Sequence, residues 1–456
     1  MVNGWFLDKE EKMDGKLSRR GFLRWSALVG VSGALAACAQ PGGSGTTTGQ
    51  ADDAGPGAAA AAVVWWNPDI ATWQPAYQEM ADEFTRQNPE IGVDIQNVPE
   101  DGFLEKISAM IASDTGPDVW VWYYATDTAR RGFLEEVTPF IERDGLRPEE
   151  LWFPICLARA TYEDKLYSVP RDGVWALVGY NQTLLDEMGV PLPVEGWTLE
   201  DYLSSCQSLT DTEQGTWGTI ISGPGALSWD TAFCWNMGFE IVSEDGRQVK
   251  GLLDSPTSIE AIQWIIDLQM EHQVAPSGAQ SQVLGEMPFA SGKIGFFPAA
   301  GWLLADLEEV SFEWDMVPSP VRNRGDEPKA WGDSVQYYMW SGSRQKDNAW
   351  ELMKFISSVE GTRIPAEAGS WTPPTPETWR ALGWDQHPVW SKFWAEAQKP
   401  TPVPNYLRTE FHWDCVFPEF EGIWTRYIEN GERPLENLVV EAADAAQACL
   451  DRSYAA

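Results

Sequence analysis

The sequence is poor in histidine, and this limits the chemistry that the protein can perform. It contains only three histidines, His272, His387 and His412, which are far apart along the chain. A metal centre built from several histidines or a Ser-His-Asp triad is therefore not expected. The motifs Gly-x-Ser-x-Gly and His-Glu-x-x-His are also absent. No serine-hydrolase triad and no histidine-based zinc site is indicated.

Basic residues are also scarce. The chain has 32 Lys and Arg against 68 Asp and Glu, a formal net charge of −36. Nucleic acid is an unsuitable partner for such a surface, because phosphate groups need clustered positive charge. The excess of acid bears on solubility and on partners and does not define the fold.

Cysteines are few and widely spaced, and no Cys-x-x-Cys pair occurs. Besides Cys38, the cysteines are Cys156, Cys206, Cys234, Cys415 and Cys449. An odd number leaves at least one unpaired, and we expect these five to be small buried hydrophobic residues rather than disulfide partners.

The longest apolar run near the N-terminus covers only 13 residues, Trp25 to Ala37. A membrane-spanning helix needs about 20, whereas an export signal has an apolar core of about 7–15 residues after a basic region. The preceding stretch, SRRGFL from Ser18, resembles a twin-arginine export signal. The run ends in LAAC, which resembles a lipobox whose cysteine, Cys38, becomes lipidated. We therefore predict a signal peptide at 1–37; the alternative is a buried amphipathic helix.

Residues 38–62 are rich in Gly, Ser, Thr and Ala and show no periodic apolar face. Such a composition predicts a flexible tether. We expect a protein exported from the cytoplasm and held by lipid at Cys38 on the outer face of the cytoplasmic membrane.

The remaining chain is too long for one core, since single cores rarely exceed about 250–300 residues. Its first part alternates predicted strands and helices. Strands are expected at 62–68, 91–98 and 117–124, with helices at 73–87 and 102–113 between them. This order predicts an α/β fold with a doubly wound parallel sheet, in which ligands bind at the carboxyl ends of strands.

The later part continues in the same way. A long extended stretch is expected at 162–181, followed by helices at 183–190 and from 199, the latter capped by Thr198 with Asp201 in its first turn. Two more amphipathic helices are expected at 258–272 and 346–359. The first should bury Ile259, Ile262, Ile266 and Leu268.

Several stretches together resemble a known family. They are GPDVWVWYYATDTARRGFLEEVTPFI, YEDKLYSVP, GKIGFFPAAGWLLADL, WGDSVQYYMWSGSRQKDNAWELMKFIS and GTRIPAEAGSWTPP. In this order they are similar to the extracellular solute-binding proteins of sugar ABC importers, of the maltodextrin-binding type. The resemblance extends over about residues 63–450. The chain departs from the family pattern at Gly332-Asp333 and at Arg171-Asp172-Gly173.

The resemblance implies a periplasmic-binding-protein-like fold of type II, with two α/β lobes and a multi-strand hinge. The chain would cross between lobes near Pro170, Gln336 and Gly369. One lobe would comprise 63–171 and 336–368, the other 172–335 and 369–456. Such a protein binds a sugar between its lobes, has no catalytic activity, and delivers its ligand to a membrane permease. No cofactor or metal is expected, and a monomer is the default expectation.

Tryptophan is abundant, with 26 residues. Indole rings cover the C–H faces of a sugar, while carboxylates and amides accept hydrogen bonds from its hydroxyls. Pairs of such residues recur, and we expect ligand contacts from Trp66, Asn67, Tyr123, Tyr124, Asp127, Asp172, Trp175, Trp229, Asp230, Trp235, Trp302, Trp331, Asp333 and Trp371.

Alternatives remain for both the residues and the ligand. Each tryptophan could pack internally, Asp172 could pair with Arg171, and Asp333 could cap a turn. The ligand could be a peptide, a polyamine or a sugar phosphate. A secreted carbohydrate-active enzyme is the other alternative, because 68 acidic residues always provide some pair of carboxylates.

Overall fold

The computed structural model describes residues 62–455, apart from 101, 123–125, 222–230, 286, 304–306, 308–309 and 400–407. The predicted signal at 1–37, Cys38 and all but the last residue of the predicted tether lie outside the described residues.

The first sheet has five strands in the order β2-β1-β3-β12-β6. Its strands are β1 (Val63–Pro68), β2 (Val93–Val98), β3 (Val119–Trp122), β6 (Ser168–Pro170) and β12 (Gln336–Met339). β1 pairs in parallel with β2 and β3, and α2 (Gln74–Gln87) and α3 (Phe103–Ala112) connect them. The predicted order of strands and helices is therefore confirmed. β12, from much later in the chain, lies antiparallel between β3 and β6.

The second sheet has the order β10-β7-β9-β8, and β11 also pairs with β7. Its strands are β7 (Val174–Asn181), β8 (Trp217–Thr219), β9 (Ile294–Ala300), β10 (Trp314–Val317) and β11 (Gly332–Asp333). Only β8 and β9 among the described pairs of this sheet run parallel. A short hairpin, β4 (Thr161–Tyr162) with β5 (Lys165–Leu166), lies apart from both sheets.

We call the first sheet with the helices before β7, α14 and α15 the first lobe. The second sheet with α8 to α12, α18 and α19 is the second lobe.

The remaining helices are α4 (Thr126–Arg130), α5 (Thr138–Arg143), α6 (Pro148–Leu151), α7 (Pro154–Ala160), α8 (Gln182–Met188), α9 (Leu199–Leu209), α10 (Thr231–Asn236), α11 (Pro256–Met270), α12 (Gly278–Val283), α14 (Lys346–Ile356), α15 (Val359–Glu367), α16 (Pro376–Ala381), α17 (Trp390–Ala397), α18 (Phe417–Trp424) and α19 (Leu435–Ala455). Short helical turns are η2 (Pro288–Ser291), η3 (Gly301–Leu303), η5 (His412–Val416) and η6 (Thr425–Glu429).

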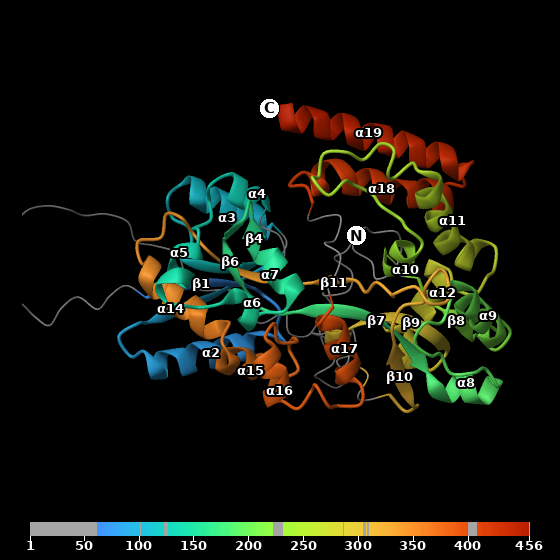
Figure 1. The fold of residues 1–456 in the computed structure, drawn as a ribbon, viewed down its shortest axis with the longest axis horizontal. Coiled ribbons are helices and arrows are strands. Elements are labelled where there is room, and N and C mark those ends of the chain that lie inside the picture. Colours follow the sequence, from blue (N-terminus) through green and yellow to red (C-terminus); the bar gives the residue numbers. More distant parts are fainter. Residues whose placement is uncertain are drawn as a thin grey trace, which may run out of the picture. The chain divides into compact units, whose positions relative to one another are not determined.

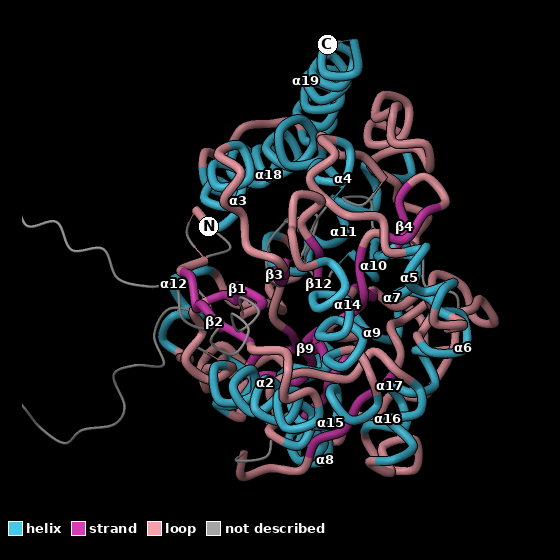
Figure 2. Tube along the Cα trace, turned by 90° about the vertical axis from the view of Figure 1, so that its left-hand side faces the viewer, coloured by secondary structure: helices cyan, strands magenta, loops and turns pink. Residues whose placement is uncertain are grey.

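The helices bury the faces that their sequences predict. α2 packs against α14 and α15 and buries Tyr77, Met80, Ala81 and Phe84. α9 begins with the expected capping box: Thr198 Oγ1 accepts from the Asp201 N–H, and Asp201 Oδ2 accepts from the Thr198 N–H. α18 and α19 lie side by side (Figures 1 and 2), and α19 also contacts α11. In α11, Ile262, Ile266 and Leu268 are buried as expected, but Ile259 is only half-buried.

The hydrophobic core crosses from one sheet to the other. One cluster begins at Val63 and Trp65 of β1 and continues through Trp175 and Leu177 of β7 to Trp379 of α16. A second cluster fills the second lobe, and a smaller one lies on the opposite face of the first sheet around Trp120. The two sheets therefore share apolar packing where the chain passes between them.

Cys415 and Cys449 form a disulfide that joins η5 to α19. The expectation that all five later cysteines would be unpaired is wrong for these two. Their separation of 34 residues gives no hint of pairing, because it is the packing of α18 and η5 against α19 that brings them together. Cys156, Cys206 and Cys234 are buried free thiols, as expected.

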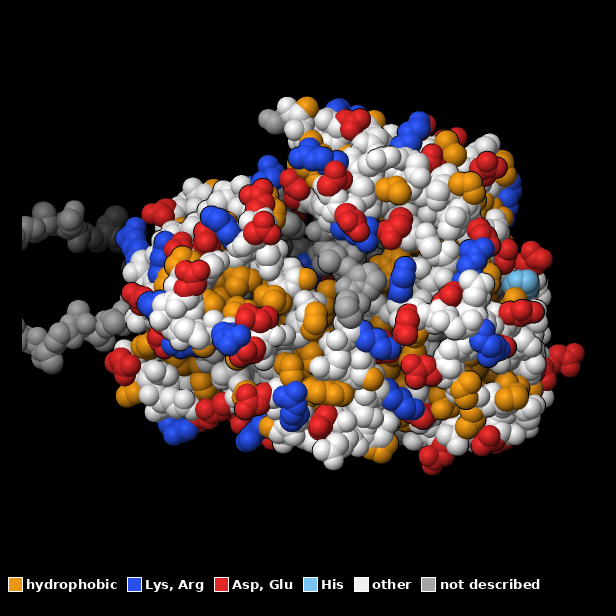
Figure 3. All heavy atoms as spheres, viewed as in Figure 1, with side chains coloured by type: hydrophobic (Ala, Val, Ile, Leu, Met, Phe, Trp, Pro, Cys, Tyr) orange, Lys and Arg blue, Asp and Glu red, His pale blue; other side chains and the backbone are white. Residues whose placement is uncertain are grey.

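The surface seen in Figure 3 carries acidic and basic side chains mixed together, without a large patch of one sign. Within the part of the chain that the structure describes, no helix combines the length and the apolar character needed to cross a bilayer.

Candidate functional site

The chain passes between the two sheets through segments that are hydrogen-bonded to one another. Arg171 to Gly173 connect β6 to β7, and Ser334 and Val335 connect β11 to β12. A third segment joins them at Thr372, whose Oγ1 donates to the Gly173 carbonyl at 2.5 Å. The Gly173 N–H in turn donates to the Thr372 carbonyl at 3.2 Å. We refer to these three segments together as the hinge.

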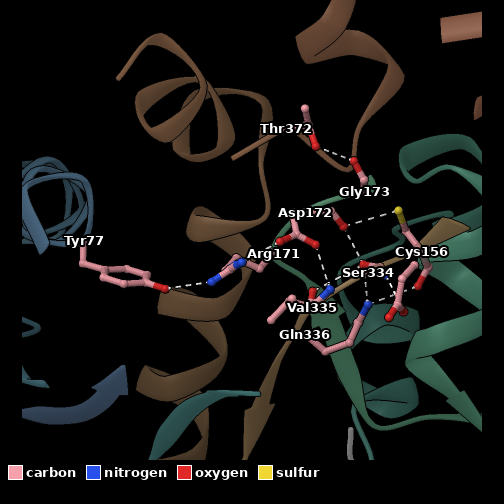
Figure 4. Close-up of polar contacts among 10 residues, drawn as sticks. Tyr77, Cys156, Arg171, Asp172, Gly173, Ser334, Val335, Gln336 and Thr372 are labelled. Carbon is pink, nitrogen blue, oxygen red and sulfur yellow. Dashed lines mark hydrogen bonds and ion pairs between the residues drawn. The ribbon is translucent and has the colours of Figure 1, made fainter. Parts of the chain in front are cut away.

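Asp172 is the centre of the hinge (Figure 4). Its carboxylate accepts from Nη2 of Arg171 at 2.6 Å and from the backbone N–H of Val335 at 2.7 Å. Its own carbonyl oxygen accepts from Ser334 Oγ at 2.5 Å and from Cys156 Sγ at 3.5 Å. One buried residue therefore ties the first crossing to the second through both its side chain and its backbone.

Arg171 extends this network to the segment around Trp371 and to α2. Its guanidinium lies over the rings of both Trp73 and Trp371, at 4.5 and 4.7 Å from their centroids, and the two rings themselves meet edge-on at 5.9 Å. It also donates to the hydroxyl of Tyr77 at 3.1 Å. Burial raises the pKa of the Asp172 carboxyl above its ordinary value, and the charge of Arg171 opposes that shift. The buried cation is thus held by a carboxylate, a phenol and two π faces.

Further polar contacts align the second crossing. Gln336 Nε2 donates to Ser334 Oγ at 2.7 Å, and Gln336 Oε1 accepts from Ser168 Oγ at 2.9 Å. Next to them, Asp333 pairs with Arg159 at 2.6 Å, with little of either side chain exposed. Each buried cation of the hinge therefore faces a carboxylate.

The hinge shows no arrangement suited to catalysis. Burial raises the pKa of the Cys156 thiol far above its ordinary value, so this cysteine is a poor nucleophile. Among the described residues, no group of three or more His, Cys, Asp or Glu side chains could hold a metal ion. The network instead fixes the backbone paths by which the two lobes are joined.

Four of the predicted ligand residues lie at this hinge. Asp172 pairs with Arg171, which was the alternative for that residue, and Asp333 pairs with Arg159. Trp371 covers Arg171 and lies 5.1 Å from the ring of Tyr77. Trp175 is 1% exposed and packs edge-on against Phe153 and Trp379. The structure brings these four together, each in contact with other protein groups.

Two further candidates lie in the core of the second lobe. Trp235 and Trp331 are both buried in the same hydrophobic cluster. The adjacent Asn236 exchanges hydrogen bonds with the backbone of Lys329, which ties α10 to the segment before β11. These tryptophans therefore contribute to the packing of α10 against the second sheet.

Trp66 and Asn67 end β1, as predicted. Trp66 donates its Nε1–H to Gln96 Oε1 at 2.9 Å and packs against Phe103. Asn67 is fully buried, and neither its amide nitrogen nor its amide oxygen has a hydrogen-bond partner among the described residues. An unpaired buried amide costs about 1–3 kcal/mol. Asn67 is therefore the described residue with the clearest unmet capacity to bind polar atoms.

The structure describes little of the remaining predicted ligand residues. Tyr123, Tyr124, Trp229 and Asp230 lie outside the described residues, and of Asp127 and Trp302 only the backbone is described, in α4 and η3.

Sequence reasoning missed most of the hinge network. Tyr77, Cys156, Arg159, Ser334 and Gln336 carry no motif that marks them. The available signal was the Arg171-Asp172-Gly173 stretch directly after a predicted crossing, since a charged pair between two apolar strands needs buried partners.

The chain matches the family model of the bacterial extracellular solute-binding protein over residues 49–363. Among curated proteins, a binding protein of Brucella abortus is 22% identical over 298 residues, covering 62% of this chain and 68% of the relative. The maltotriose-binding protein of Pyrococcus abyssi is 21% identical over 302 residues, covering 65% and 62%.

Solved structures of sugar-binding proteins share the fold. The sugar-binding protein MalE of Xanthomonas citri matches with a TM-score of 0.72 at 20% identity, covering 86% of this chain and 98% of that one. The GacH receptor of Streptomyces glaucescens, solved unliganded and with acarbose, matches with a TM-score of 0.71 at 19% identity over 86% and 98%. A substrate-binding protein of Listeria monocytogenes in complex with cycloalternan gives 0.70 at 22% identity over 85% and 98%.

Proposed function

The chain belongs to the bacterial extracellular solute-binding proteins, and we propose that it captures a sugar or oligosaccharide between its two lobes and delivers it to the permease of an ABC importer. It is a binding protein and not an enzyme. The observation that carries the proposal is the combination of this family match with two α/β sheets joined by hydrogen-bonded crossing strands. Such a joint permits hinge closure on a ligand.

The proposed lobes comprise 63–171 with 336–368, and 172–335 with 369–456. The strand order supports the boundaries at 171/172 and 335/336, because β6 and β7 belong to different sheets, as do β11 and β12. The hydrogen bonds between Gly173 and Thr372 support a third crossing near Gly369.

A neutral ligand agrees better with the hinge than an anionic one does. A phosphate or carboxylate ligand needs an Arg or Lys side chain directed at it. Arg171 and Arg159, the buried cations of the hinge, are each paired with a protein carboxylate. A sugar phosphate is therefore the less favoured alternative, and peptides or polyamines remain further alternatives.

For the contacts themselves, we propose Asn67 as an amide that hydrogen-bonds sugar hydroxyls. The sequence also favours Tyr123, Tyr124, Asp127, Trp229, Asp230 and Trp302. Asp172, Trp175, Trp235, Trp331, Asp333, Trp371 and Trp66 are left out of the proposed set, because packing, ion pairs or hydrogen bonds within the protein already engage them.

The family is extracellular, and we further propose how this member stays at its membrane. Residues 1–37 would direct export, Cys38 would carry lipid, and the residues up to 62 would act as a tether. A lipid anchor keeps a monomeric binding protein close to the permease that receives its ligand.

Thermal unfolding in the presence of candidate ligands tests the proposal. The panel contains maltotriose, acarbose, cycloalternan and tagatose, with spermidine, a tripeptide and glucose 6-phosphate as the competing classes. A sugar at 100 times its Kd should stabilise the protein by about 2.7 kcal/mol. Stabilisation by spermidine, the peptide or the sugar phosphate alone would replace the sugar assignment. Turnover of a glycoside would contradict a binding function.

A further inference from the structure

The two lobes also contact each other away from the hinge, through Arg130 of the first lobe and Glu410 and Phe411 of the second. Arg130, the last residue of α4 in the first lobe, places Nε 3.6 Å from Oε1 of Glu410. Its guanidinium also lies over the ring of Phe411, 5.2 Å from the centroid. Glu410 and Phe411 directly precede η5, which packs against α18 and α19 of the second lobe.

The second-lobe side of this contact is firmly held. Arg408 pairs with Glu240 at 2.7 Å and donates to the Val242 carbonyl at 2.9 Å. The buried Thr409 shares a hydrogen bond of 2.9 Å with the hydroxyl of Tyr454 on α19.

The residues that follow Glu410 are anchored to α19 as well. The ring of Phe411 packs edge-on against that of Tyr454 at 4.9 Å. Four residues further on, Cys415 is bonded to Cys449 of the same helix. Glu410 and Phe411 are therefore presented from a rigid base, and their position relative to Arg130 follows the position of the second lobe.

The first-lobe side is more open. The Arg130 side chain is 41% exposed, against 14% for Glu410. Tyr162 of β4 also senses this acid: burial raises the pKa of its phenol, and the carboxylates of Glu163 and Glu410 add to the shift. The direct contact of the first lobe with Glu410 is made by Arg130, and the charge of the same carboxylate also acts on Tyr162.

We infer that Arg130, Glu410 and Phe411 form a latch that holds the two lobes together and slows the release of bound ligand. This inference rests on the proposed function for its consequence, since only a hinged binding protein uses lobe opening to release its ligand. The three side chains are positioning residues: they act on lobe closure and need not touch the ligand. A partly exposed ion pair and one cation–π contact are individually weak, so the latch should change the rate of opening only about 3- to 10-fold.

Distances between the lobes test the latch without any ligand. Spin labels at Glu105→Cys on α3 and Glu436→Cys on α19 report the separation of the lobes by pulsed electron paramagnetic resonance in the full chain. Both positions are exposed, whereas the three free cysteines among the described residues are buried. The Arg130→Gln and Glu410→Gln variants should each add a population at longer distance. The double variant Arg130→Glu with Glu410→Arg should return the distribution towards that of the parent.

A matched control separates the latch from a general loss of surface charge. Arg322 pairs with Glu260 inside the second lobe, and its side chain is 39% exposed, close to the value for Arg130. The Arg322→Gln variant should leave the distances unchanged. Unaltered distances in Arg130→Gln and Glu410→Gln, or an equal change in the control, would overturn the inference.

Ligand kinetics give the second readout, with maltotriose as the probe. Arg130→Gln should raise its dissociation rate about 3- to 10-fold and leave its association rate nearly unchanged. Salt at 1 M, where the Debye length is about 3 Å, should raise the rate for the parent towards that of the variant. If the parent does not bind maltotriose or any other sugar, the proposed function fails, while the distance measurement still decides whether the latch exists.

Discussion

The carboxylate of Asp172 accepts a hydrogen bond of 2.7 Å from the backbone N–H of Val335, although 163 positions separate the two residues. This bond joins two connecting segments, each of which links a strand of one sheet to a strand of the other. The position of the two connecting segments relative to each other therefore depends on the buried side chain of Asp172. The hinge is therefore a single polar unit rather than three independent linkers.

Neutralising Asp172 should destabilise the protein strongly. The Asp172→Asn variant keeps the shape of the side chain but leaves the buried Arg171 without its carboxylate. Breaking a buried pair from one side costs about 3–5 kcal/mol, which urea unfolding will measure. The control is Asp347→Asn, which removes a surface partner of Arg143 and should cost less than about 1 kcal/mol. If both variants lost the same free energy of unfolding, the pair of Asp172 and Arg171 would stabilise the protein no more than a surface ion pair does.

Replacing Asn67 should separate stability from ligand binding. Asn67→Leu removes a buried amide that has no partner among the described residues, so the free energy of unfolding should rise by about 1 kcal/mol. Sugar affinity, measured by isothermal titration, should fall at least 10-fold. A variant that binds sugar as well as the parent would exclude Asn67 from the ligand site.

The disulfide should contribute substantially to stability. Closing a loop of 34 residues stabilises by about 2–4 kcal/mol, chiefly by restricting the unfolded chain. The double variant Cys415→Ser with Cys449→Ser should lose this amount in urea unfolding. Dithiothreitol should destabilise the parent and have no effect on the double variant; sensitivity of the double variant would mean that another bond is being reduced.

His412 should make the protein sensitive to acid. Burial lowers the pKa of this imidazole from about 6.5 to about 3, so the unfolded chain takes up a proton that the folded chain excludes. The contribution of the neutral His412 to the free energy of unfolding is complete above pH 6.5. It is lost as the pH falls towards 3, by about 1.4 kcal/mol per pH unit. Urea unfolding between pH 6.5 and 4 should show a steeper loss for the parent than for His412→Gln. Parallel curves for the two proteins would contradict this prediction.

Lipidation at Cys38 should determine where the protein is found. Cys38→Ala should move the protein from the membrane fraction to the soluble exported fraction of the producing bacterium. Phase separation in a detergent that clouds on warming measures the change. A variant that still partitions with the detergent would rule out Cys38 as the anchor.

Local patterns predicted much of the fold. The helix expected at 73–87 forms as α2, and Tyr77, Met80, Ala81 and Phe84, whose spacing puts them on one face of a helix, are all buried. The capping box of α9 was readable because the spacing of Thr198 and Asp201 is a local property of the chain. Both kinds of signal depend on neighbours within about one turn of helix, and this is why a single sequence reveals them.

The candidate site was predicted less well. The sequence named tryptophans and acids next to the hinge as ligand contacts, but it does not say which protein groups they contact. Asp172 and Trp371 meet Arg171 because three distant segments converge there. The disulfide between Cys415 and Cys449 escaped prediction for the same reason.

The sequence by itself determined the alternation of strands and helices and the scarcity of histidine. Those features follow from composition and from periodicity along the chain, whereas the two-lobe architecture was implied by the family resemblance. Only the tertiary structure decided which polar side chains are engaged within the protein, because hydrogen bonds and ion pairs between residues such as Asp172 and Val335 exist only once folding brings their donor and acceptor atoms within about 3 Å of each other. The same folding leaves Asn67 buried with its amide unmatched among the described residues.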